Sequence, residues 1–511
     1  DGGTAVVWAD GYTRFAGHIA SRGGPLGGDG GQVEVSGKAV LGFQGTAGLS
    51  APLGNDGLLL LDPSNLEIRN QPSDYNITNE GNLWETGFSG ITSILTVSRL
   101  QSLLDTSNII VRTVAGGTSD QAGDITVVDD FDGLSSSNLL HLKALGDIRF
   151  DANVKSDGNM SLWAEARGGI VQSAGKQLGT PRSKLKNIRL TALGSTAGGA
   201  GILPKFISAS HLELETEGAD VRQTSGVIDV NELVLIGKNG ANFSLKGKWN
   251  TPEKSNKIRR IGGDIDGDLT LRNNIALNIA NDVKAVIGRN DPYSGLWSAG
   301  ADITIETTAK VSGIHVNTRS SRDDSSSSAG NFTIEVLGDE SHVTLGADPF
   351  SSVPDDSMTL SLAGDLANVK AENGITTVST KGTNSDMYVA GFYAWQNAGM
   401  GDMVLSAGRD LRFSSKGSDL SGGQLTLEVG REMVVRSGLR ASTVIVDAPR
   451  TEYLYDYSIS AQALTFLGEL YIGPSNDDVV DLSSADPSNP YVDLRGKLSI
   501  RTPNDVRVYA K

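Results

Sequence analysis

A short unit that recurs at intervals of about 22 positions restricts the folds open to this sequence. One copy, Met403–Leu411, reads apolar-x-apolar-x-small-Gly-x-acidic-apolar. The turn glycines Gly408 and Gly430 are one such period apart, as are Gly146 and Gly168. Apolar residues that alternate with period two predict β-strands, so the unit is not a helical repeat of the tetratricopeptide or ankyrin kind.

A coil of this length holds three short strands and their turns, which is the size of one turn of a parallel β-helix. In such a solenoid each strand pairs with the equivalent strands of the neighbouring coils, and alternating apolar side chains stack in the interior. We therefore predict an all-β, right-handed parallel β-helix of about 22-residue coils with extruded loops. Tight corners favour Gly, Asp and Asn, so we interpret Asp147, Asp365 and Asp410 as corner residues and not as functional carboxylates.

The composition fits this fold and excludes several classes of protein. The chain has 63 Gly and only 6% aromatic residues, which suits many turns and thin apolar layers. Its 44 Lys and Arg against 60 Asp and Glu give a net charge of −16, so nucleic acid and anionic membranes are not expected partners. The absence of cysteine excludes disulfides, thiolate metal sites and cysteine nucleophiles. The densest apolar run, Leu58–Leu61, is far shorter than the roughly 20 residues of a membrane span, so no membrane insertion is expected.

The region 1–70 contains an ordered series of distinctive patterns. The series runs through Gly2–Gly11, Phe15–Ile19, Gly27–Lys38, Leu41–Gly45 and Leu58–Ile68. It resembles the region that follows the secretion domain in large two-partner-secretion exoproteins of Gram-negative bacteria, the filamentous-haemagglutinin-like adhesins. A weaker resemblance continues to about residue 150, with a short helical segment that ends at Leu104 and a later strand at Gly123–Val127.

This resemblance implies a non-catalytic adhesin segment that is secreted and lies at the bacterial cell surface or outside the cell. It implies transport by an outer-membrane partner barrel through a secretion domain missing from this sequence. The expected roles are attachment, aggregation or biofilm formation, with a host surface glycan or protein, or a biofilm exopolysaccharide, as partner. Two alternatives stay open: capture of a host haem-carrier protein for iron acquisition, and a β-helical polysaccharide-cleaving enzyme.

Departures from the period divide the chain. The stretch between Lys238 and Arg260 is locally basic and is the largest candidate for an insertion. Segments rich in Ser, Pro, Asp and Gly are expected to be loops that leave the coils. The predicted organisation is signature coils at 1–70, a shaft at 71–237, irregular coils with the basic insertion loop at 238–300, and a second shaft at 301–511 with loops at 320–329, 350–357 and 473–490.

Motifs for catalysis and metal binding are scarce. The five histidines lie far apart in the sequence, and none has a metal-ligand spacing. Gly262–Asp268 differs from the calcium-binding nonapeptide because Ile265 and Gly267 stand where Gly and Asp are required. No nucleophilic triad, phosphate loop or dinucleotide fingerprint occurs. We therefore expect a protein that is not an enzyme and uses no metal or cofactor.

Aromatic and basic clusters supply the candidate ligand-binding residues, because sugars stack on exposed rings and hydrogen-bond to polar neighbours. Packing between coils is the alternative role for the rings, and a solvated loop is the alternative for the basic insertion. The candidates are Trp249, Lys254, Lys257, Arg259, Arg260, Tyr388, Tyr393, Trp395, Tyr453, Tyr455 and Tyr457.

Overall fold

A computed structural model describes most of the chain and divides it into two compact units. Unit 1 comprises Asp1–Lys257 and Lys284–Asp291, and unit 2 comprises Ile258–Val283 and Pro292–Lys511. The structure describes all residues except 72–91, 114–120, 134, 158, 248–254, 281, 285–291, 294, 309–310, 313–315, 319–329, 338–342, 346–357, 361–368, 381–382, 390–399, 414–417, 436–438, 454–458, 461–462, 468, 473–478, 483–490, 495–497, 501–504 and 509–511.

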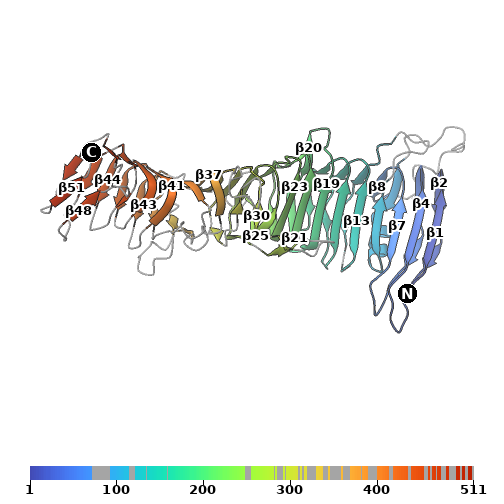
Figure 1. The fold of residues 1–511 in the computed structure, drawn as a ribbon. Helices are drawn as coiled ribbons and strands as arrows, with labels where there is room; N and C mark the ends of the chain where they lie inside the picture. Colours follow the sequence, from blue (N-terminus) through green and yellow to red (C-terminus); the bar gives the residue numbers. More distant parts are fainter. Residues whose placement is uncertain are drawn as a thin grey trace. The chain divides into compact units, whose positions relative to one another are not determined.

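Each unit consists of stacked parallel strands, so the chain is a parallel β-helix and the predicted fold class is confirmed (Figure 1). The predicted composition of one coil is also confirmed, since Leu139–Ala144, Ile148–Phe150 and Val154–Lys155 form three successive short strands. Among the described residues, no helix has the length and apolar character needed to cross a membrane.

The coils of unit 1 have three sides, each of them a parallel ladder. The first side is β1 (Thr4–Ala9), β4 (Gln32–Gly37), β7 (Leu58–Asp62), β10 (Asn108–Arg112), β13 (Leu139–Ala144), β16 (Ser161–Ala166), β19 (Leu185–Ala192), β21 (Phe206–Glu217) and β23 (Ile228–Lys238). The second side is β2 (Tyr12–Phe15), β5 (Val40–Phe43), β9 (Ser93–Thr96), β8 (Leu66–Arg69), β11 (Ile125–Val127), β14 (Ile148–Phe150), β17 (Ile170–Gln172), β20 (Ala200–Leu203), β22 (Asp220–Gln223) and β24 (Phe243–Leu245). The third side contains β3 (His18–Ala20) with β6 (Thr46–Gly48), and β12 (Phe131–Asp132) with β15 (Val154–Lys155) and β18 (Gln177–Leu178).

The register of the strands reproduces the period counted in the sequence. Leu140 pairs with Leu162, one period later, and Leu162 pairs with Ile188 where the coil is longer. Ile188 in turn pairs with Leu212, and Leu212 pairs with Leu233. Each of these five side chains is at most 1% exposed. Alternate apolar residues therefore form continuous buried columns, as the pattern predicted.

A short helix, α2 (Val97–Leu104), interrupts the strands of unit 1. Thr96 caps its N-terminus by accepting a hydrogen bond from the backbone N–H of Arg99. One face of the helix, including Leu100 and Leu104, is buried. Gln101 fixes the helix to the neighbouring strand by donating to the Asp132 carbonyl at 2.7 Å. The helix and the later strand β11 lie where the family resemblance placed a helical segment and a strand.

At the corners, carboxylates of one coil accept hydrogen bonds from the backbone of the next coil. The Asp124 Oδ1 accepts the backbone N–H of Asp147 at 2.7 Å, and the Asp147 Oδ1 accepts the backbone N–H of Gly169 at 2.7 Å. A Cβ atom on Gly146 would lie 2.0 Å from the Asp124 Oδ1, and one on Gly168 would lie 2.2 Å from the Asp147 Oδ1. Glycine therefore precedes the acidic residue because the carboxylate of the preceding coil occupies the place of its side chain.

The same contact recurs along both units, which confirms the corner role predicted for Asp147. Asp365 lies outside the described residues. Further carboxylate or amide oxygens that accept a backbone N–H of the following coil belong to Asp29, Asn65, Asp130, Asp220, Asp268, Asp302, Asn331 and Asp402.

Unit 2 contains two long ladders. The first is β26 (Leu269–Asn273), β31 (Ile303–Thr307), β34 (Phe332–Val336), β37 (Val369–Thr380), β39 (Met400–Ala407), β41 (Ser418–Val429), β43 (Leu439–Asp447), β46 (Ala463–Phe466) and β49 (Tyr491–Leu494). The second is β36 (Met358–Leu360), β35 (Val343–Leu345), β38 (Met387–Val389), β40 (Asp410–Phe413), β42 (Glu432–Val435), β44 (Arg450–Tyr453), β47 (Glu469–Ile472) and β50 (Leu498–Ile500).

Two predicted loops differ from the structure. The expected insertion between Lys238 and Arg260 contains strand β24 and the first residues of β25 (Lys257–Asp264). The expected loop at 473–490 contains β48 (Val479–Leu482), which pairs with β51 (Asp505–Val508). The sequence did not predict these strands, because residues typical of turns lie close to them. A short strand can still form between turn residues when a neighbouring coil supplies its hydrogen bonds. The expected loops at 320–329 and 350–357 lie outside the described residues.

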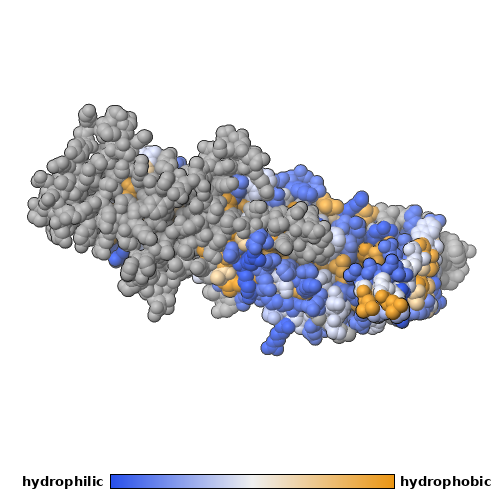
Figure 2. Space-filling view, turned by 60° about the horizontal axis from the view of Figure 1, so that its bottom comes forward, coloured by the Kyte–Doolittle hydropathy of each residue, from blue (hydrophilic) through white to orange (hydrophobic). Residues whose placement is uncertain are grey.

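On the face shown in Figure 2, the coloured part of the surface is mostly hydrophilic, with smaller apolar areas between the polar side chains. Trp8 is 55% exposed and Leu53 is 69% exposed. Scattered apolar side chains of this kind are normal on protein surfaces and define no site by themselves.

The corner contact predicts a specific cost for adding one methyl group. In Gly168→Ala the new Cβ displaces the Asp147 carboxylate, so the hydrogen bond to Gly169 is lost and the free energy of unfolding falls by about 1–2 kcal/mol. Denaturant unfolding followed by circular dichroism measures this change. Gly3→Ala is the control, since a Cβ on Gly3 meets nothing within 4 Å. If the double variant Gly168→Ala/Asp147→Ala lost the sum of the unfolding free energies lost by the two single variants, the explanation would be contradicted.

Candidate functional site

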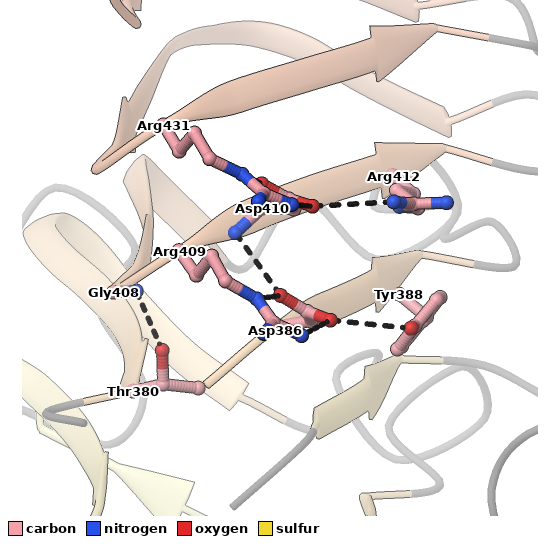
Figure 3. A network of polar contacts seen from close by, with 8 residues as sticks. All are labelled: Thr380, Asp386, Tyr388, Gly408, Arg409, Asp410, Arg412 and Arg431. Atoms are coloured by element: carbon pink, nitrogen blue, oxygen red, sulfur yellow. Dashed lines mark hydrogen bonds and ion pairs between the residues drawn. The ribbon is translucent and has the colours of Figure 1, made fainter. Parts of the chain in front are cut away.

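A cluster of arginines, aspartates and one tyrosine lies at a corner of unit 2, and we call it the arginine–tyrosine cluster. Its members are Asp386, Tyr388, Arg409, Asp410, Arg412 and Arg431 (Figure 3). They come from β38, β40 and β42 and from the residues just before these strands. The sequence repeats Gly-Arg-acidic at 408–410 and at 430–432. Equivalent residues of successive coils therefore lie side by side.

Arg409 and Arg431 each donate two parallel hydrogen bonds to the aspartate of the preceding coil. Arg409 donates from Nε to the Asp386 Oδ1 at 2.6 Å and from Nη2 to Oδ2 at 2.5 Å. Arg431 donates from Nε to the Asp410 Oδ1 at 2.7 Å and from Nη2 to Oδ2. Bidentate arginine–carboxylate pairs are strong and directional, so both guanidinium groups are held in fixed orientations.

The third arginine and the tyrosine are held more loosely. Arg412 donates from Nη2 to the Asp410 Oδ2 at 3.2 Å, and the Tyr388 hydroxyl donates to the Asp386 Oδ2 at 3.4 Å. Tyr388 and Arg412 are register partners on neighbouring strands, so the ring and the guanidinium lie next to each other.

The acidic groups are buried and the basic groups face solvent. The side chains of Asp386 and Asp410 are 5% and 1% exposed, whereas those of Arg409, Arg412 and Arg431 are 33%, 43% and 62% exposed. Burial opposes ionisation of Asp410, but the hydrogen bonds and charges of Arg431 and Arg412 outweigh it and lower the pKa of this carboxyl. Burial, followed by the charge of Asp386, raises the pKa of Tyr388, so its hydroxyl stays protonated at neutral pH.

This arrangement is suited to binding rather than to proton transfer. A guanidinium has five N–H groups, and each bidentate pair uses two of them. Within the cluster three guanidinium groups stand against two carboxylates, and the next carboxylate in register, Glu432, forms an ion pair with Arg450. The cluster therefore presents oriented donors and an aromatic ring to ligands that carry hydroxyl or acidic oxygen atoms.

Of the predicted ligand-binding residues, Tyr388 lies in this cluster. Lys257, Arg259 and Arg260 lie in strand β25 and not on an extruded loop, and Arg260 forms an ion pair with Asp282. Tyr453 ends strand β44. Trp249, Lys254, Tyr393, Trp395, Tyr455 and Tyr457 lie outside the described residues.

The sequence-based prediction missed Asp386, Arg409, Arg412 and Arg431. The signal was present, because Arg recurs between the turn glycine and the acidic residue in Gly408–Asp410 and again one coil later. We interpreted the acidic residues as corners, which is correct for the position of Asp410. Its partners in the structure are nevertheless arginine side chains.

A second polar cluster lies on the outward side of the first ladder of unit 1 and is largely buried. The rings of His141 and Trp163 stack with centroids 4.0 Å apart and planes 3° apart. The Arg189 guanidinium carbon lies 4.5 Å from the centroid of the Trp163 ring, and Arg189 forms ion pairs with Glu213 at 3.0 Å and Glu215 at 2.7 Å. His141, Arg189 and Glu213 are 7%, 7% and 0% exposed, so this cluster joins coils and is closed to a large ligand.

Groups of three or more potential metal ligands are absent from the part of the chain that the structure describes. Comparison with models of protein families and with curated proteins gives no match for this chain.

The pKa of His141 predicts an acid-sensitive contribution to stability. Burial, opposed by the charge of Glu165, lowers this pKa from 6.5 to about 4. Stability that depends on neutral His141 is complete above the pKa of the unfolded chain and is lost as the pH falls from about 6.5 towards 4, by up to about 3 kcal/mol. We expect His141→Gln to reduce the fall in unfolding free energy between pH 7 and pH 4.5, whereas exposed His18→Gln leaves it unchanged. Parallel pH profiles for wild type and His141→Gln would contradict this.

The arginine pairs predict a second effect on stability. Asp410→Asn removes the charge that Arg412 and Arg431 share, and it should lower the unfolding free energy by about 2 kcal/mol at pH 7, less than for a fully buried pair because both arginines face solvent. Because the folded-state pKa of Asp410 is lowered, the difference from wild type should shrink as the pH falls below about 4. Denaturant titrations at several pH values test this, with exposed Asp10→Asn as the control. A difference that persists unchanged at pH 2 would count against a charge-based role.

Proposed function

We propose that this chain is a non-catalytic segment of a secreted bacterial surface adhesin, and that the arginine–tyrosine cluster is one of its contact sites. The observation that carries the proposal is the pair of arginines, Arg409 and Arg431, whose orientation is fixed by buried aspartates while their outer N–H groups face solvent. Side chains already ordered before binding lose less entropy when a ligand arrives. This favours recognition by the free protein without rearrangement.

The protonation of the cluster favours binding over cleavage of a polysaccharide. Glycoside hydrolysis uses one carboxylic acid with a raised pKa as proton donor and a second, ionised carboxylate. Arginines lower the pKa of Asp410. Arg409 donates a hydrogen bond to each carboxylate oxygen of Asp386. Asp410 is therefore not poised to donate a proton to a leaving group, and the enzymatic alternative gains no support from this carboxyl.

The partner we propose is a glycan, on a host surface or in a biofilm matrix. Tyr388 supplies a ring for stacking, and Arg412 beside it supplies N–H donors for sugar hydroxyl or carboxylate oxygens. Single contacts of this kind are weak, but many copies of a protein on one cell bind jointly. Attachment, aggregation and biofilm formation all depend on such multivalent contacts.

The export route rests on the resemblance of the region 1–70 to filamentous-haemagglutinin-like exoproteins. We propose that a secretion domain and an outer-membrane partner barrel carry the protein to the cell surface. A β-helix suits this route, because its coils pair with their neighbours and can fold one after another as the chain emerges.

Glycan-array binding by the full chain tests the contact site. We expect Tyr388→Leu and Arg412→Gln each to weaken binding to recognised glycans by about 10-fold or more, since each removes a direct contact. Arg149→Gln in unit 1, whose side chain is 48% exposed, is the matched control. If all three variants bound the glycans equally well, the cluster would not be part of the contact surface. Capture of a haem-carrying serum protein in place of glycans would favour the iron-acquisition alternative, and release of unsaturated sugar products would favour the enzyme.

A further inference from the structure

Two neighbouring coils of unit 1 contain the same turn, and each turn presents an exposed leucine. The sequence Pro-Leu-Gly-x-Asp-Gly occurs at 25–30 and again one coil later at 52–57. Leu26 is 97% exposed and Leu53 is 69% exposed, the highest values among the large apolar side chains that the structure describes. One exposed leucine defines no site, but two at equivalent positions of stacked coils form a surface that the fold repeats.

Both turns are closed by backbone hydrogen bonds. We call residues 24–27 and 51–54 the leucine turns. In each of them the N–H of the last residue donates to the carbonyl of the first, at 3.3 Å in one turn and 3.2 Å in the other. Proline at the second position sets the backbone angle, and Gly27 has a φ of 132°, which other residues rarely adopt. The leucines therefore lie at the tips of rigid turns.

The two leucine turns contact each other across the coils. The Asp29 Oδ1 accepts the backbone N–H of Asn55 at 2.8 Å. A Cβ atom on Gly54 would lie 2.4 Å from the Gly28 carbonyl oxygen, so the two backbones approach closely. Leu53 remains 69% exposed although the turn of the preceding coil lies against its own. The fold thus fixes the leucines as a pair and does not cover them.

The leucine turns protrude and have no charge. Figure 1 shows the connections that lead into β4 and β7 extending past the beginnings of these strands, near the label N. Figure 2 brings this side forward and shows an apolar area at the same end of unit 1. No charged residue occurs in 23–28 or 50–54, whereas the whole chain has a net charge of −16. The tips are therefore apolar and neutral on an acidic protein.

This combination of shape and charge favours a neutral lipid surface as the partner. A protein partner would need a pocket that matches both tips, and a second copy of this chain presents the same convex tips. A fluid lipid surface adapts to protruding side chains and takes up apolar groups at the boundary of its acyl chains. Anionic lipids attract basic segments, which these turns lack, and they repel an acidic chain.

We propose that the leucine turns insert Leu26 and Leu53 into the surface of a zwitterionic membrane, such as one of phosphatidylcholine. Only the tips enter the lipid, so this contact differs from the insertion of a membrane-spanning segment. A myristoyl chain has more carbon atoms than two leucine side chains and binds membranes only marginally, so one molecule binds weakly and clustered copies bind jointly. The inference goes beyond the proposed function, because it concerns another unit and a ligand without sugars.

Partitioning of the full chain onto vesicles of pure phosphatidylcholine, measured by co-sedimentation over a range of lipid concentrations, tests the proposal. We expect Leu26→Ser combined with Leu53→Ser to weaken partitioning by about 10-fold or more, because two apolar side chains no longer leave water. Each single variant should lie between the double variant and wild type. The matched control is Leu193→Ser, an exposed leucine elsewhere in unit 1, which should bind as wild type does.

A fluorescent label at the tip reports the insertion itself. The chain has no cysteine, so Leu26→Cys can be labelled at a single position with an environment-sensitive dye. The emission of this dye should shift to the blue when phosphatidylcholine vesicles are added. The same dye at Arg149→Cys, a side chain that is 48% exposed on another side of unit 1, should show no shift.

Salt and lipid charge separate an apolar contact from an electrostatic one. We expect partitioning onto phosphatidylcholine to be insensitive to salt, and to fall when phosphatidylserine is added at low salt. Absence of binding by wild type, equal binding by the double variant, or tighter binding to vesicles that contain phosphatidylserine would overturn the proposal. Self-association that needs both leucines and no lipid, seen by analytical ultracentrifugation, would replace it with contact between copies.

The vesicles contain no glycan, so the outcome at the leucine turns is independent of the proposed adhesin site. Tyr388→Leu, which should weaken glycan binding, is expected to partition onto the vesicles as wild type does.

Discussion

The structure depends on a carboxylate or amide at the corner of one coil that accepts the backbone N–H of the next. In unit 1 this contact links Asp124 to Asp147 and Asp147 to Gly169, and glycine is needed where the carboxylate approaches the backbone. A strand ladder alone can slip by a residue, and such a slip exchanges the buried and exposed faces. A side chain that recognises one particular N–H at the corner opposes the slip. Every row of side chains described for both units follows from that fixed register.

The sequence predicted the features that repeat and missed those that depend on which residues become neighbours. Alternating apolar residues and turn glycines were sufficient for the fold, for the buried columns and for the corner role of Asp147. They did not reveal the partners of Arg409 and Arg431, although Asp386 and Asp410 lie about one period earlier, because the acidic residues were interpreted as corners that bind only the backbone. Coil length also varies along the chain. Thr333 and Thr377 are register partners although twice the usual period separates them. No fixed count along the sequence identifies such a pair.

Local composition was misleading where short strands lie between turn residues. Lys257 and Arg260 were expected on a loop because the segment around them is basic and lacks the period, yet they belong to β25. A strand of this kind is stabilised mainly by pairing with a neighbouring coil, and a single sequence contains little information about that neighbour. Tyr388 was found because aromatic residues are rare in this chain and it lies in one of their clusters, whereas its arginine neighbours resembled ordinary solvated side chains.

The variable spacing between register partners shows how this architecture can acquire new segments. Strands that follow their partners at less than one period or at twice the period still align side chain for side chain, as Leu425 does with Val444 and Thr333 does with Thr377. Lengthening a connection adds little closure entropy, since the cost grows only with the logarithm of its length. Each corner is therefore a position where evolution can insert or exchange a segment while the rows on the other sides stay intact. In a lineage under changing selection by hosts or competitors, such a chain can alter what it displays without losing its fold.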